Sequence, residues 1–94
     1  MYLLRIEHKV SDYNSWKNAF DSDPVGRKKM GVRHYQISRP ADDDKYVIVD
    51  LEFDTIEKVK TFLDAMQIVW GNVAGKIIVD PKTRITELME TKFY

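Results

Sequence analysis

One side chain in this 94-residue sequence stands out as a candidate acid or base, the imidazole of His8. It lies near the end of an alternating segment, residues 2–10, on a face whose other side chains are mostly apolar. Apolar surroundings disfavour the charged imidazole, whereas Asp12 would favour it if the two groups were close. A neutral imidazole can accept a proton from a hydroxyl or a carbon acid, or donate a hydrogen bond to a carbonyl. We therefore predict that His8 is a catalytic residue in a ligand site, or alternatively a packing histidine bonded to Asp12 or to a backbone carbonyl.

Large apolar side chains recur at helical spacing in two parts of the chain. Trp16 and Phe20 are one helical turn apart, and so are Met66 and Trp70. Pairs of this kind pack the core in most helices, but they can also form the wall of a cavity. Methionine in particular adapts to irregular gaps and to varied apolar ligands.

Metal and nucleophile chemistry has little support in the sequence. The chain has no cysteine, which excludes disulfides, zinc–thiolate sites, iron–sulfur clusters and cysteine nucleophiles. The second of its two histidines, His34, is expected to be exposed or at an interface, and two histidines without a third ligand at motif spacing argue against zinc. The acidic run at residues 42–44 lacks the spacing and the glycine of a calcium loop. Glycine-rich phosphate loops and a nucleophile elbow are absent. We expect no metal and no cofactor.

The composition describes an ordinary globular chain. Fifteen Lys and Arg balance fifteen Asp and Glu, which argues against a general nucleic-acid binder. No apolar run has the length of a membrane span, and the first seven residues reach charge too soon for a signal peptide. We expect one domain, residues 1–94, that is cytoplasmic and has no membrane or nucleic-acid partner.

The elements that must position these side chains follow from the hydropathy pattern. Four segments are predicted as strands: residues 2–10, 32–39, 46–53 and 83–90. Helices are predicted from about Tyr13 to Phe20 and along the apolar stripe from Ile56 to Trp70, closed by Asn72 and Gly75. The β-α-β-β-α-β order predicts a ferredoxin-like α+β fold, in which both helices cover one face of a four-stranded antiparallel sheet.

Smaller features refine these boundaries. Ser11 and Asp12 offer an N-cap for the first helix, and Pro24 predicts a break after it. A second short helical piece is expected through residues 27–29, with Gly31 at its C-terminal end. Asp54 and Glu57 resemble a capping box for the second long helix. A short apolar run at residues 77–79 is expected to end at Asp80-Pro81.

The sheet face away from the helices has a mixed character. Its predicted side chains are Leu3, Arg5, Glu7, Lys9, Tyr46, Ile48, Asp50 and Glu52. This set is too apolar for a simple water-facing surface and too charged for a dry core. It fits a protein interface with paired charges, or a solvated face with a few stray apolar residues.

Residues 8–21 resemble the "H-x-V-x-D-Y-x-x-W-K-x-x-F-D" opening of small dimeric α+β barrel proteins. The likeness continues through Arg27, Gly31-Val32, Arg39, the Asp42-Asp43 turn and the strand ending Glu52-Phe53-Asp54, and fades after about Met66. This superfamily includes antibiotic-biosynthesis monooxygenase-like proteins, polyketide cyclases, muconolactone-isomerase-like enzymes and haem-degrading enzymes. Within it, the subset that this sequence resembles most consists of uncharacterised bacterial proteins.

The resemblance implies a homodimer whose two sheets pack face to face, and a ligand cavity in each subunit between its own sheet and helices. It makes Arg27 a candidate partner for a ligand carboxylate, although the cations at residues 27–29 could instead complement a helix dipole. It argues against haem, because the haem-degrading relatives supply a histidine from their helical side and no histidine follows His34 here. The predicted ligand-binding residues are Ile6, Trp16, Phe20, Arg27, Val49, Leu51, Phe62, Met66 and Trp70.

Three functions remain open at this point. The first is a cofactor-independent monooxygenase, isomerase or cyclase that acts on a lipophilic carbonyl compound, such as an aromatic polyketide-like or fatty-acyl ligand. The second is a protein that binds such a ligand without transforming it. The third is a structural dimer whose cavity is filled by its own side chains. A fold-level likeness does not choose among them.

Overall fold

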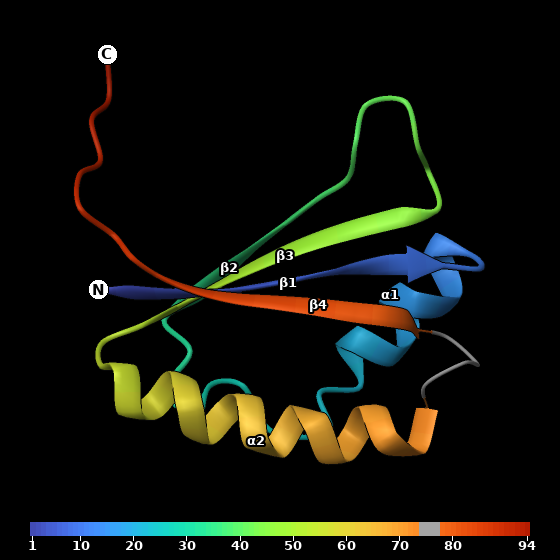
Figure 1. Ribbon diagram of the computed structural model, residues 1–94, viewed down its shortest axis with the longest axis horizontal. Coiled ribbons are helices and arrows are strands. Elements are labelled where there is room, and N and C mark those ends of the chain that lie inside the picture. Colours follow the sequence, from blue (N-terminus) through green and yellow to red (C-terminus); the bar gives the residue numbers. More distant parts are fainter. Residues whose placement is uncertain (74–77) are drawn as a thin grey trace.

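The computed structural model of the chain describes residues 1–73 and 78–94. Its elements are β1 (Tyr2–Val10), α1 (Tyr13–Asp21), β2 (His34–Ser38), β3 (Tyr46–Phe53), α2 (Ile56–Val73) and β4 (Ile78–Glu87). The strands form one antiparallel sheet in the order β2-β3-β1-β4. Both helices lie on the same side of this sheet (Figure 1). The predicted ferredoxin-like α+β fold is confirmed.

The two central strands, β1 and β3, form the floor of the core. They pair from Tyr2 opposite Phe53 to Lys9 opposite Tyr46, and on each strand alternate side chains face the helices. The buried inward residues are Leu4, Ile6, His8, Val10, Val47, Val49, Leu51 and Phe53. The helices close this core with Trp16 from α1 and with Val59, Phe62 and Trp70 from α2. The period-two pattern therefore placed the inward face of both strands correctly.

Helix α1 begins and ends where the sequence predicts. The carboxylate of Asp12 caps it by accepting hydrogen bonds from the backbone N–H and the hydroxyl of Ser15, both at 2.9 Å. The helix ends at Asp21, and Asp23 then takes a left-handed conformation with φ of +50° directly before Pro24. The chain consequently leaves the helix axis at the predicted break.

The prediction of a second short helix through residues 27–29 is wrong. The structure has a single hydrogen-bonded turn there, in which the Met30 N–H donates to the Gly26 carbonyl and the Val32 N–H donates to the Arg27 carbonyl. Gly26 has a φ of +81°, outside the helical region, so the turn cannot extend backward. Gly31 ends the turn with a φ of +99°, as its predicted C-terminal position requires.

The predicted capping box of α2 is also displaced by one residue. The helix begins at Ile56, and the backbone N–H of Lys58 donates to the Thr55 hydroxyl oxygen at 3.3 Å. Thr55 is therefore the N-cap, and Glu57 is one position too early to complete a box. The carboxylate of Asp54 instead accepts a hydrogen bond from Arg33 at 3.3 Å.

The last strand starts earlier and ends earlier than predicted. The segment predicted at residues 83–90 corresponds to β4, which spans Ile78–Glu87. The strand therefore also contains residues 78 and 79 of the short apolar run that was expected to end at Asp80-Pro81. The second strand is shorter than its predicted range, 32–39. Residues 75 and 77, which figured in the predicted boundaries, lie outside the described residues.

A β-bulge explains how β4 continues through a sequence that reads as a breaker. The register of β4 against β1 shifts between Glu7 and Lys9, so Asp80 and Pro81 together lie opposite His8. Asp80 has a φ of +52°. Proline is tolerated at this place because β4 is an edge strand of the sheet.

The sheet face away from the helices carries the predicted mixture of side chains. Arg5 donates two hydrogen bonds to the carboxylate of Asp50, at 2.9 and 3.1 Å. The hydroxyl of Tyr46 donates to Glu7 at 2.7 Å. Ile48 lies between these polar pairs and is half-buried within the single chain. The face is thus apolar at its centre and charge-paired around it.

Candidate functional site

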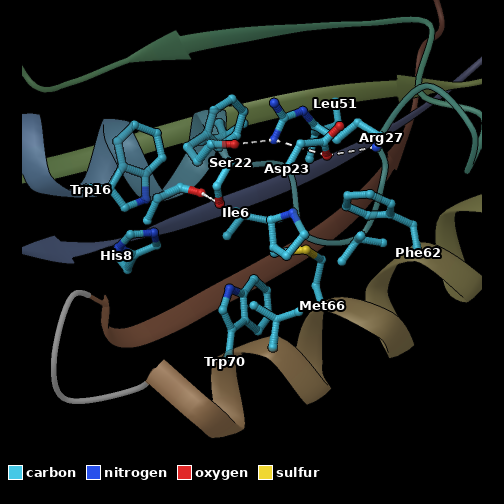
Figure 2. Close-up of a pocket in the computed structure, with 16 residues that line it drawn as sticks. Ile6, His8, Trp16, Ser22, Asp23, Arg27, Leu51, Phe62, Met66 and Trp70 are labelled. Atoms are coloured by element: carbon cyan, nitrogen blue, oxygen red, sulfur yellow. Dashed lines mark hydrogen bonds and ion pairs between the residues drawn. The ribbon is translucent and has the colours of Figure 1, made fainter.

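A cavity of about 370 Å³ lies between the inner sheet face, both helices and the turn that follows α1 (Figure 2). The structure brings all ten predicted site residues to its walls: Ile6, His8, Trp16, Phe20, Arg27, Val49, Leu51, Phe62, Met66 and Trp70. Most of the lining is apolar. Residues predicted in five separate parts of the chain, namely β1, α1, the turn that contains Arg27, β3 and α2, therefore share one cavity.

Regular secondary structure fixes most of this lining. Ile6 and His8 project from β1, and Val49 and Leu51 project from the neighbouring strand β3. Val49 lies opposite Ile6 in the register, so the floor is continuous across both strands. The walls come from side chains spaced by one turn on each helix, which places them on a single stripe facing the sheet.

Aromatic rings form the wall at the α1 side. The ring centroids of Trp16 and Phe20 are 5.2 Å apart, and those of Trp16 and His8 are 6.0 Å apart with an edge-on geometry. Phe20 also contacts the ring of Tyr35 on β2 at 5.0 Å. Contacts of this geometry hold ring orientations firmly, because edge-on and tilted pairs are favoured over face-to-face stacking.

His8 is almost completely buried, with 3% of its surface exposed, and it lies beside Trp16 (Figure 2). Burial lowers the pKa of His8 below its ordinary value, and the hydrogen bond to the Lys9 backbone acts in the opposite direction with smaller effect. The predicted hydrogen bond between Asp12 and the imidazole is not formed, because the Asp12 carboxylate caps α1. The imidazole is therefore neutral at neutral pH.

The tautomer of His8 follows from its hydrogen bond. Nδ1 lies 3.1 Å from the Lys9 carbonyl oxygen, which can only accept, so Nδ1 carries the proton. Nε2 is then the unprotonated nitrogen, and it has no hydrogen-bond partner among the described residues. The bond to a backbone carbonyl is the one that the packing alternative predicts, and it leaves Nε2 as the ring nitrogen that can accept a proton.

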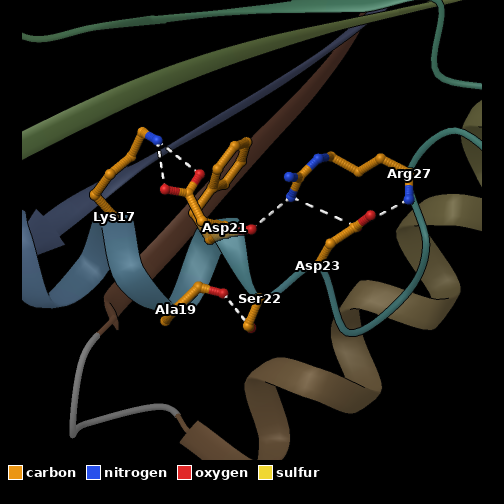
Figure 3. A network of polar contacts seen from close by, with 7 residues as sticks. Lys17, Ala19, Asp21, Ser22, Asp23 and Arg27 are labelled. Carbon is orange, nitrogen blue, oxygen red and sulfur yellow. Dashed lines mark hydrogen bonds and ion pairs between the residues drawn. The ribbon is translucent and has the colours of Figure 1, made fainter.

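Arg27 lies toward the opposite end of the cavity from His8 (Figure 2). Its Nη1 donates to the Phe20 carbonyl at 2.8 Å, and its backbone N–H donates to the Asp23 carboxylate at 2.9 Å (Figure 3). The guanidinium carbon lies 3.9 Å from the centroid of the Phe20 ring. Arg27 thus binds the C-terminal end of α1 rather than complementing a helix of its own. Its Nε and Nη2 groups have no acceptor among the described residues.

Beyond the ten predicted residues, the cavity is lined by Val69 on α2 and by five residues that the sequence reasoning missed: Ala19, Ser22, Asp23, Pro24 and Val25. Four of them belong to the turn after α1, where no periodicity indicates which side chains face inward. The predicted break at Pro24 is the sequence signal that could have found them. A chain that leaves α1 at that point passes the open end of the cavity between the sheet and the helices.

The described residues contain no group of three or more His, Asp or Glu side chains that could hold a metal ion. His34 lies on the other sheet face, where its Nε2 contacts the carboxylate of Glu52. No helix in the described part of the chain is both long enough and apolar enough to cross a membrane.

No protein-family model and no curated protein sequence matches this chain. Solved structures do match it. A ferredoxin-like protein from an uncultured marine organism, described as dimeric, is 12% identical with a TM-score of 0.66, and the match covers 100% of both chains. A monooxygenase from the gene ActVA-Orf6 of Streptomyces coelicolor, solved with the ligand Nanaomycin D, is 8% identical with a TM-score of 0.66, covering 99% of this chain and 91% of the monooxygenase.

A third match is a point mutant of MhuD, solved with two manganese protoporphyrin IX molecules in each active site. It is 13% identical with a TM-score of 0.72, and the match covers 100% of both chains. At such low identity these likenesses concern the fold. They confirm the predicted structural resemblance to ferredoxin-like proteins that include monooxygenases.

Proposed function

We propose that this protein binds a small lipophilic ligand, aromatic polyketide-like or fatty-acyl, in the cavity between its sheet and helices, and that His8 acts there as a base. The observation that carries the proposal is a mainly apolar cavity of about 370 Å³ with one buried imidazole in its wall. Ligand pockets are typically concave and apolar with few polar groups that fix orientation. The ActVA-Orf6 monooxygenase, solved with Nanaomycin D bound, supports ligand binding by this fold.

The chemistry open to such a site is proton transfer. Nε2 of His8 removes a proton from a phenol or from a carbon next to a carbonyl, which leaves an enolate or phenolate on the ligand. Return of the proton to another atom isomerises the ligand, and attack of the enolate on an internal carbonyl cyclises it. Oxygenation would need molecular oxygen as co-reactant, with the ligand supplying the electrons. A dry cavity protects such intermediates from water.

Binding without turnover is the second candidate. It is favoured by the scarcity of ionisable groups in the lining. Among the described residues, His8 is accompanied there only by Asp23 and Arg27, which bond each other, and Arg27 also bonds the end of α1. An apolar ligand can bind through burial alone, at roughly 25 cal/mol per Å² of apolar surface removed from water.

A porphyrin, as held by MhuD, does not fit this lining. Helices α1 and α2 contain no histidine, and the single histidine of the cavity lies on the sheet floor with one nitrogen already bonded to a backbone carbonyl. We derive no step through such a group.

The proposal includes a homodimer joined through the open sheet face. The face has an apolar centre around Ile48, and β4 brings Arg84 beside the Arg5–Asp50 pair. Cationic and anionic side chains that surround an apolar centre suit an interface in which the same surface of two copies pairs with itself. The dimeric description of the marine ferredoxin-like protein supports this assembly for the fold.

A thermal-shift panel of fused-ring phenols and medium-chain fatty acids tests ligand binding. At tenfold excess over Kd, a ligand stabilises the folded state by about 1.4 kcal/mol, which raises the melting temperature of a domain of this size by roughly 6–11 °C. We expect such a rise for at least one class. No shift across the panel at saturating concentration would refute the proposal.

A further inference from the structure

A second hollow, a surface groove of about 570 Å³, lies beside the β2 edge of the sheet. We call it the cationic groove, because four cationic side chains line it, Arg27, Lys28, Arg33 and Lys58, against the two carboxylates of Asp23 and Asp54. The chain as a whole has no net formal charge, so this excess of positive charge is local. A groove with such an excess attracts anions.

Two of these cations, Arg33 and Lys58, have contacts with neighbouring parts of the groove. A Cβ at Gly31 would lie 2.8 Å from Cδ of Lys58, so the hydrocarbon chain of Lys58 passes directly over the glycine. Asp54 is shared, with Arg33 at 3.3 Å and the Lys58 ammonium at 3.9 Å. Both cations stay about half exposed and accessible to a ligand.

The cationic groove and the apolar cavity are adjacent and share part of their lining. Asp23 and Arg27 line both of them. The Arg27 side chain is only 16% exposed, and its Nη1 is anchored on the Phe20 carbonyl, which leaves Nε and Nη2 without an acceptor among the described residues. A ligand whose apolar body fills the cavity would pass Arg27 with its polar end and reach the groove beyond it.

We propose that the cationic groove binds the phosphate group of an amphiphile whose apolar body occupies the cavity. The inference rests on the proposed function and specifies its ligand class. A single carboxylate would be matched by the Arg27 guanidinium alone, whereas Lys28, Arg33 and Lys58 lie further out and provide partners for a phosphate, which carries close to two charges at neutral pH. Two arginines and two lysines around one head group combine directional and point-charge contacts.

The test compares decyl phosphate, decanoate and 1-decanol, which share one alkyl chain, by titration calorimetry at low ionic strength. We expect decyl phosphate to bind most tightly. Lys58→Gln should weaken decyl phosphate by about fivefold, the scale of one exposed ion pair, and leave 1-decanol unchanged. Lys60→Gln, an exposed cation on the same helix outside the groove, is the matched control and should change neither.

The outcomes separate this inference from the proposed function. Equal affinity of the three compounds, or an unchanged affinity of Lys58→Gln for decyl phosphate, would overturn the groove while the cavity stands. Inorganic phosphate that binds as tightly as decyl phosphate would also overturn it, because the groove would then act without the cavity. Failure of all three compounds to bind would overturn the groove together with the fatty-acyl form of the proposed function, and the fused-ring phenols of the thermal-shift panel then test the aromatic form.

Discussion

Replacement of His8 by Phe isolates the contribution of its free ring nitrogen to binding. The variant keeps a ring of similar size against Trp16 and removes both nitrogens. Because Nδ1 is engaged by the Lys9 carbonyl, only Nε2 can meet a ligand, so at most one hydrogen bond to the ligand is lost. One such bond contributes about 0.5–1.5 kcal/mol, which corresponds to a roughly two- to tenfold change in affinity. If the ligand is also turned over, loss of the base should lower the rate by about 10²–10⁴-fold.

The assay pairs 2-naphthol with naphthalene, which differ by one hydroxyl, and follows quenching of tryptophan fluorescence. Wild type should favour 2-naphthol by more than the variant does, whereas both proteins bind naphthalene alike. Met66→Leu is the matched control, because it changes an apolar wall residue of similar volume and should alter both affinities together. If His8→Phe has the same preference for 2-naphthol as wild type, His8 is a packing residue and its assignment as a base is wrong.

Three further predictions follow from the same geometry. Because burial lowers the pKa of folded His8, the unfolded chain binds more protons below about pH 6.5, and the free energy of unfolding should fall with acidification more steeply in wild type than in His8→Phe, as measured by urea titrations; parallel profiles would contradict this. Ile48→Arg should give monomers in sedimentation velocity at micromolar concentration, while Ile68→Arg, on an exposed helix position, should not; a wild-type monomer would refute the dimer. Met66→Trp should fill the cavity and lower ligand affinity at least about tenfold without loss of stability; a loss of about 1–3 kcal/mol would indicate a core that is already filled.

Alternation along β1 and β3 made the cavity floor predictable. In a strand the side-chain period is two, so the burial of Ile6 and Val49 follows from the pattern once one face is apolar. The helix walls followed in the same way, since Trp16 and Phe20 must share a face at helical spacing. These parts of the site depend on local geometry alone, and His8 was placed among them by its position on the inward face of β1.

The parts that could not be predicted depend on contacts between distant residues. Asp80-Pro81 reads as the end of a segment, yet β4 continues because a bulge opposite His8 accommodates the extra residue. The turn after α1 contributes to the cavity through the left-handed Asp23 and through Arg27, which reaches back to the Phe20 carbonyl. Neither the bulge nor the hydrogen bond from Arg27 to Phe20 has a periodic signature in the sequence.

The most direct test of the cavity as a ligand site uses the two tryptophans of the chain, Trp16 and Trp70, which both line it. Their indole N–H groups give two separate signals in a ¹⁵N-labelled sample, and each reports from a different wall. On titration with 2-naphthol or decanoate, both signals should move and saturate together with one Kd. If both signals stay fixed while the melting temperature rises, the ligand binds elsewhere, and the account of this cavity is contradicted.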